Sequence, residues 1–114
     1  MDNRFATVIV PVKDLEGAKA FYSELLGTGP AQDSEYYVGF ELEGQTVGLN
    51  PHGFEQGLTG PVPYRAVEDL EAAIAALTAA GGEVRQKPQP VGGGRTIATV
   101  ADADGNIVGL THDE

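Results

Sequence analysis

Short apolar runs alternate along the chain with segments in which apolar residues recur every three or four positions. The runs predict strands, and the spaced segments predict helices. Residues 5–12 form a mostly apolar and β-branched run, which is typical of a strand. After Asp14, apolar residues recur every three or four positions, which is the spacing of an amphipathic helix. Asp14 is placed to cap this helix, and Gly27 is placed to end it. The apolar positions of the helix are Leu15, Ala18, Tyr22, Leu25 and Leu26.

The rest of the first half predicts further strands. Residues 36–42 and 45–50 are expected to be two strands, joined by a short turn at Glu43 and Gly44. A short strand is also expected between Gly29 and Asp33. The predicted order of the first half is therefore β-α-β-β-β.

The second half predicts the same order. A strand over residues 62–67 leads to a helix that Asp69 caps and Gly81-Gly82 ends. The apolar positions of this helix are Leu70, Ala73, Ile74, Leu77 and Ala80. Three strands are expected to follow it, at residues 83–87, 95–101 and 107–111, with a turn at residues 102–105.

An internal repeat supports this reading. Residues 12–18 (VKDLEGA) and 67–73 (VEDLEAA) share five of seven positions at an offset of 67 − 12 = 55. Residues 44–49 (GQTVGL) and 105–110 (GNIVGL) share four of six at an offset of 105 − 44 = 61. The six extra residues fit an insertion near residues 88–94, where Pro and Gly cluster. We therefore predict one domain, residues 1–114, made of two tandem modules at 1–57 and 58–114.

Composition narrows the classes of function. The chain has 114 residues, no cysteine, and 17 acidic against 7 basic residues, for a net charge of −10. Disulfides and thiolate chemistry are excluded. Nucleic-acid binding is not expected, because it needs a Lys- and Arg-rich surface. No apolar stretch approaches the roughly 20 residues of a membrane span, and the N-terminus does not lead into a secretory leader. We therefore expect a cytoplasmic protein without a membrane partner.

Several short motifs, in this order and in duplicate, resemble the vicinal oxygen chelate superfamily of glyoxalases, bleomycin-resistance proteins and extradiol dioxygenases. They are Val-x-Asp-Leu-Glu-x-Ala after the first strand of each half, Phe21-Tyr22 with Leu25-Leu26-Gly27, Ala80-Gly81-Gly82, and Asp102-x-Asp104-Gly105-Asn106. The resemblance spans essentially the whole chain. It implies an α+β fold in which two βαβββ modules form an eight-stranded, cup-like mixed sheet with the helices outside. It also implies a homodimer.

Enzymes of this superfamily hold a divalent metal at four repeat-related positions, usually His or Gln on each first strand and Glu on each last strand. The resemblance puts Thr7 and Val62 at the first-strand positions, and Gly48 and Gly109 at the last-strand positions. The internal repeat supports this register, because 7 + 55 = 62 and 48 + 61 = 109. Val and Gly offer no donor side chain, and a lone Thr hydroxyl is a weak ligand. We therefore predict neither a metal site here nor a cofactor.

Strand alternation predicts which residues line the face opposite the helices. Val38, Phe40 and Leu42 suit the helix side, which turns Tyr37, Gly39 and Glu41 to the other face together with Thr46. Arg95 directly follows the Gly92–Gly94 tip, and two roles stay open for it: it reaches an anionic group, or it faces water. The predicted ligand-binding residues are Thr7, Ile9, Tyr37, Glu41, Gly48, Asn50, Val62, Tyr64, Arg95 and Gly109.

Three functions stay open at this stage. The first is a metal-free protein that binds or sequesters a drug-like or metabolite molecule, and a cationic ligand would suit the acidic balance. The second is a lyase- or isomerase-type enzyme that uses Glu41 as a general base, or a displaced metal site with His52 or His112. The third is an accessory module with a vestigial cavity. Loss of turnover in Glu41→Gln would separate the second from the first.

Overall fold

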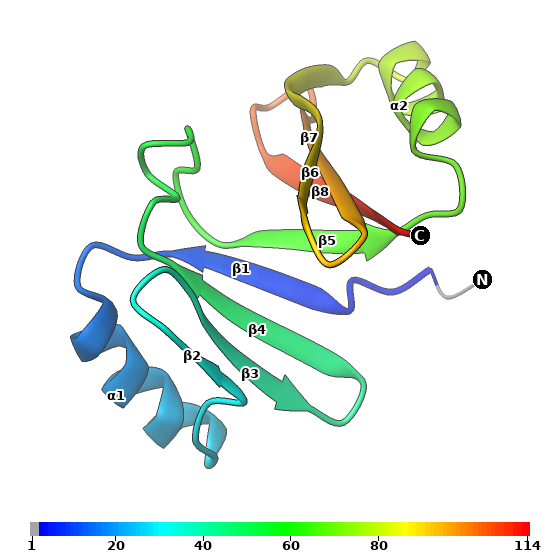
Figure 1. Ribbon diagram of the computed structural model, residues 1–114. Coiled ribbons are helices and arrows are strands. Elements are labelled where there is room, and N and C mark those ends of the chain that lie inside the picture. Colours follow the sequence, from blue (N-terminus) through cyan, green and yellow to red (C-terminus); the bar gives the residue numbers. More distant parts are fainter. Residues whose placement is uncertain (1–2) are drawn as a thin grey trace. The chain divides into compact units, whose positions relative to one another are not determined.

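The structure is a computed structural model that describes residues 3–114. Residues 1 and 2, which belong to the predicted domain and its first module, lie outside the described residues. Its fold is α+β, with eight strands in mixed pairing and two helices, as predicted (Figure 1). The elements are β1 (Thr7–Pro11), α1 (Leu15–Leu26), β2 (Gln32–Asp33), β3 (Val38–Leu42), β4 (Gln45–Asn50), β5 (Val62–Ala66), α2 (Leu70–Ala79), β6 (Glu83–Gly92), β7 (Arg95–Ala101) and β8 (Ile107–Asp113).

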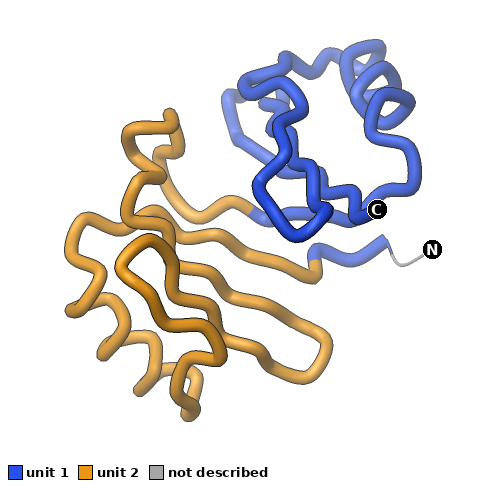
Figure 2. The backbone as a smooth tube through the Cα atoms, viewed as in Figure 1, with its two compact units in different colours: residues 1–5, 63–114 blue, residues 6–62 orange. Residues whose placement is uncertain are grey.

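The chain divides into two compact units, which Figure 2 shows in different colours. Unit 2 is residues 6–62, and unit 1 is residues 63–114 together with residues 3–5. Each unit carries one helix. Neither helix of the described residues is long and apolar enough to cross a membrane.

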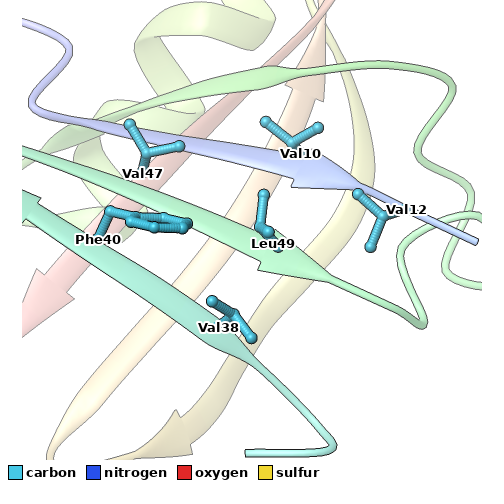
Figure 3. Packing of buried hydrophobic residues seen from close by; sticks show 6 residues of the cluster. All are labelled: Val10, Val12, Val38, Phe40, Val47 and Leu49. Atoms are coloured by element: carbon cyan, nitrogen blue, oxygen red, sulfur yellow. The ribbon is translucent and has the colours of Figure 1, made fainter. Parts of the chain in front are cut away.

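Unit 2 contains a sheet in the order β2-β3-β4-β1. Strand β4 pairs with β1 in parallel and with β3 antiparallel. Helix α1 covers one face of this sheet through Leu15, Ala18, Tyr22 and Leu26. Under it lies a core of buried residues, shown in Figure 3: Val10, Val12, Val38, Phe40, Val47 and Leu49. The predicted helix side of β3 is thereby confirmed.

Unit 1 repeats this arrangement with the order β5-β8-β7-β6. Strand β8 pairs with β5 in parallel and with β7 antiparallel. Its core is built from Leu70 of α2 and from Ala98, Val100 and Leu110 of the sheet, with Val67, Ala73, Ile74, Leu77 and Val108 packed against it. The offsets of the internal repeat therefore correspond to equivalent positions of two similar βαβββ units.

The helix starts follow from local chemistry. Asp14 accepts a hydrogen bond from Gly17 N, and Asp69 accepts one from Ala72 N, so both predicted N-caps are confirmed. Gly27 ends α1 in the left-handed conformation, at φ 71°. Helix α2 ends before the predicted Gly81-Gly82, since its C-cap is Ala80.

Several strand limits differ from the prediction. Strand β1, expected over residues 5–12, covers only Thr7–Pro11, and β5 ends at Ala66 and not at residue 67. Strand β6 runs to Gly92 and not to Lys87, because the hairpin with β7 continues through Pro88 and Pro90. Prolines are tolerated there because β6 is an edge strand with register shifts. Strand β8 likewise runs to Asp113. Strand β3 begins only at Val38, since Ser34 Oγ accepts hydrogen bonds from Tyr36 N and Tyr37 N in a turn before it.

Candidate functional site

The face of the unit 2 sheet that is opposite α1 carries rows of side chains across β1, β4 and β3. The strand register aligns Thr7 with Thr46, and Thr46 with Glu41. The Thr46 hydroxyl lies 3.0 Å from each carboxylate oxygen of Glu41, to which it donates a hydrogen bond. This first row is therefore polar and places a carboxylate at an exposed position.

The next row consists of Ile9, Gly48 and Gly39, and the ring of Tyr37 lies over its two glycines. Gly39 and Gly48 are direct cross-strand partners. A Cβ on Gly48 would lie 2.7 Å from Tyr37 Cε1 and 2.8 Å from Ile9 Cδ1, and would also meet the Tyr37 hydroxyl. A Cβ on Gly39 would lie 2.9 Å from Tyr37 Cε2. Both contacts are closer than real Cβ atoms make, so a side chain at either position would have to displace the Tyr37 ring.

Asn50, on the third row, is engaged in holding the following loop. Its Oδ1 accepts a hydrogen bond from His52 N at 2.9 Å, and its Nδ2 donates to Gln56 Oε1 at 3.0 Å. The main chain adds a hydrogen bond from Val12 N to Asn50 O. Asn50 therefore supports the loop over residues 51–57 as well as the sheet.

In unit 1 a tyrosine stands at the position of Ile9 in unit 2, and its ring lies over the equivalent glycine. Tyr64 on β5 is the direct partner of Gly109 on β8, and Thr99 on β7 is the next residue across. A Cβ on Gly109 would meet the Tyr64 ring at Cγ, Cδ2 and Cε2. Tyr64 is only 5% exposed, and this burial raises the pKa of its phenol. Val62, two residues earlier on β5, is fully buried.

Arg95 is held by a carboxylate across the β7–β8 hairpin. Its Nε and Nη2 donate to Asp113 at 2.7 and 3.0 Å, a two-point contact between residues that are directly paired in the sheet. These hydrogen bonds lower the pKa of the Asp113 carboxyl. The positive φ values of Gly92, Gly93 and Gly94 confirm the predicted hairpin tip beside this pair.

The two histidines have local partners. His52 Nδ1 lies 3.6 Å from Glu55 Oε2, and His112 Nδ1 lies 3.1 Å from Val67 O. Within residues 3–114, no group of three or more His, Cys, Asp or Glu side chains is arranged to hold a metal ion. In the described part of the chain, neither His52 nor His112 thus belongs to a cluster of metal donors.

Comparison with known proteins agrees with this architecture. Residues 4–110 match the family model of the Glyoxalase/Bleomycin resistance protein/Dioxygenase superfamily. The chain belongs to this superfamily. A protein named probable lactoylglutathione lyase from Vibrio parahaemolyticus is 30% identical, over 99% of this chain and 93% of its own length.

Solved structures of other proteins share the fold. A glyoxalase/bleomycin resistance protein/dioxygenase superfamily member from Vibrio splendidus has a TM-score of 0.70 at 18% identity, covering 95% of this chain and 97% of its own. Methylmalonyl-CoA epimerase from Streptomyces coelicolor has a TM-score of 0.69 at 14% identity, covering 97% of each chain. At these identities the likeness concerns the fold alone.

The residues at the family's four metal-ligand positions do not fit a metal. Gly48 and Gly109 have no side chain, and aromatic rings occupy the space into which a carboxylate would extend. Val62 is a buried hydrocarbon, and Thr7 offers one neutral hydroxyl. A catalytic zinc site takes about three protein ligands of the Cys, His or carboxylate type. The superfamily's metal centre therefore has no donor set at these positions.

The sequence pointed to the right strands but missed several partners. Thr46 was placed on the ligand face without its hydrogen bond to Glu41, which follows from the β3–β4 register. Gly39 was not expected to pair with Gly48 beneath an aromatic ring. Asp113 was missed, although an acidic residue near the end of β8 in a hairpin with Arg95 on β7 is a usable signal.

Proposed function

We propose that this chain binds a small organic molecule without a divalent metal, as a ligand-binding member of its superfamily. The observation that carries the proposal is the pair of tyrosine-covered glycines. Tyr37 lies over Gly48 and Tyr64 over Gly109, so two repeat-related positions carry aromatic rings where metal-binding relatives carry donor groups. The Tyr37 ring is partly exposed and offers its surface to a ligand, whereas Tyr64 is buried. Aromatic surface with a few polar groups is the usual lining of a small-molecule site. The proposed ligand-binding residues are those predicted from the sequence.

Metal content and ligand binding together test this proposal. Untagged protein, purified without chelator and dialysed against Zn²⁺, Ni²⁺, Co²⁺ and Mn²⁺ in turn, is expected to retain far less than one equivalent by elemental mass spectrometry. A near-stoichiometric metal would overturn the proposal. A His52→Ala/His112→Ala variant would then show whether a displaced site holds it.

The second arm of the test is a thermal-shift screen with a library of small organic molecules. We expect some of them to raise the melting temperature saturably, because anything that binds only the folded state stabilises it. Isothermal calorimetry should confirm each such molecule. A broad library that yields no saturable ligand would contradict the proposal.

Lactoylglutathione lyase activity is a second candidate, favoured by the 30% identity to the Vibrio parahaemolyticus protein over nearly the whole chain. In this chain it would have to proceed through acid–base groups such as Glu41, since the metal donor set is lacking. An assay with and without added metal ions tests it. Turnover that disappears in Glu41→Gln would make the enzyme the better assignment, and turnover at background level would remove it.

A homodimer and a cytoplasmic location belong to the same proposal. The family resemblance supports the dimer, and light scattering should give twice the chain mass of 11.9 kDa. A monomer at all working concentrations would contradict it. Cell fractionation with an antibody against the native protein would test the location.

A further inference from the structure

We propose that the face of unit 2 opposite α1 selects organic cations, through the ring of Tyr37 and the carboxylate of Glu41. This inference rests on the proposed small-molecule function and names its ligand class. Its central observation is that the two groups lie on adjacent rows of one sheet face. Tyr37 covers Gly39, and Glu41 is two residues further along the same strand. Two residues of an extended strand span roughly 7 Å.

The spacing suits a compact organic ammonium ion. A cation over an aromatic face is attracted when it lies within about 6 Å of the ring centroid. A carboxylate one row away can then reach the same positive charge. Tyr37 is partly exposed, and Glu41 is exposed, so a ligand has access to both. An anion would be repelled at this position, and a neutral molecule would gain no attraction from the charge of the carboxylate.

The surrounding charge favours the same class. Unit 2 carries eight carboxylates and two lysines over residues 6–62, a net charge of 2 − 8 = −6 with histidine neutral. The Nζ of Lys19 forms ion pairs with Asp33 and Glu16. The Nζ of Lys13 lies 5.5 Å from the centroid of the Phe54 ring. Both lysines of unit 2 thus have contacts other than Glu41. Among the described residues, Glu41 has a hydrogen bond from Thr46 and no ion pair. A cationic ligand would complete this carboxylate's contacts.

The two glycines determine how closely the Tyr37 ring approaches the sheet. Because neither Gly39 nor Gly48 has a side chain, the Tyr37 ring lies directly on the backbone of β3 and β4. The main chain thereby limits how the ring can tilt toward the sheet. A ring held in this way presents its π-surface at little entropic cost on binding, which is the general advantage of a preorganised site.

The experiment compares a cation with its neutral isostere. The full chain, labelled with ¹⁵N and ¹³C, is titrated with choline and with 3,3-dimethylbutan-1-ol, in which carbon replaces the ammonium nitrogen. Choline is expected to shift the resonances of the Tyr37 ring and of the Glu41 and Thr46 amides saturably. The neutral alcohol should bind at least about 3-fold more weakly. Equal affinities would overturn the inference, as would choline shifts confined to other residues.

Variants assign the effect to the two groups. Glu41→Gln should weaken choline binding by about 3–5-fold and leave the alcohol unchanged, since an exposed ion pair contributes at most about 1 kcal/mol. Tyr37→Leu should weaken it by about 3–10-fold, whereas Tyr37→Phe keeps the ring and should retain it. Glu24→Gln on α1 removes the same charge on the helix side of the sheet and should have no effect. An unchanged affinity in Glu41→Gln would remove the inference.

The outcomes separate the two proposals. If the screen of the preceding section yields ligands but the choline comparison shows no preference for charge, only the cation class is overturned. If no ligand of any class binds saturably, both the cation inference and the proposed small-molecule function are overturned.

Discussion

The ring of Tyr64 fills the space that a side chain on Gly109 would occupy. The two residues are direct partners in the parallel β5–β8 ladder, and a Cβ at position 109 would meet Tyr64 Cγ, Cδ2 and Cε2. Cγ is the ring atom nearest the backbone, so turning the ring about χ2 cannot move it away. A side chain at position 109 would therefore need another χ1 rotamer of the buried Tyr64, or a shift of the two strands.

Gly109→Ala is expected to destabilise the protein by about 1–3 kcal/mol, the usual cost of overpacking a filled site. Urea denaturation measures the loss. Gly60→Ala is the matched control, because nothing lies within 4 Å of a Cβ there and its φ is not positive. A loss at Gly109 no larger than at Gly60 would show that Tyr64 does not occupy this space. In Gly109→Ala/Tyr64→Ala the two changes should be non-additive by at least about 0.5 kcal/mol.

Gly48→Ala is expected to cost less than Gly109→Ala, because the atoms in its way are easier to displace. They belong to the outer edge of the Tyr37 ring and to Ile9 Cδ1, and Tyr37 is only partly buried. We expect a loss below about 1.5 kcal/mol together with a rotation of the Tyr37 ring. Urea denaturation and the ring resonances of Tyr37 test the two parts. A cost equal to that of Gly109→Ala would mean that Tyr37 is held as firmly as Tyr64.

The fold could be predicted from the sequence because the same pattern of strands and helix occurs in each of the two modules. The helix caps Asp14 and Asp69 act within four residues, so local chemistry decides them. The tyrosine-covered glycines were not predictable in the same way. Whether Tyr37 lies on Gly48 depends on which residues of β3 and β4 pair, and on a turn that begins β3 at Val38. Strand alternation gave the face of each residue but not its partner.

The Arg95–Asp113 pair should depend on pH in a defined direction. Arg95 lowers the pKa of the Asp113 carboxyl below its usual 3.8. A group with a lowered folded pKa contributes stability that is present above 3.8 and is lost as pH falls through the folded value. In Arg95→Gln the pKa of Asp113, followed by the NMR shift of its carboxyl carbon, should rise toward 3.8. Since both side chains are about half exposed, salt should weaken the effect. An unchanged Asp113 pKa in the variant would contradict the pairing.

The Tyr64 phenol should ionise at a higher pH than an ordinary tyrosine. Its burial raises the pKa of the phenol above the ordinary 10.0, because the charged phenolate is poorly solvated inside the protein. The unfolded chain then loses this proton at a lower pH than the folded chain does. Between the unfolded and folded pKa values the unfolded state binds fewer protons, so stability falls as pH rises above about 10. An ultraviolet titration of the phenolate band should show a late component that is missing in Tyr64→Phe, while Tyr36→Phe, at an exposed residue, should retain it. If the late component survives in Tyr64→Phe, it does not come from the buried phenol.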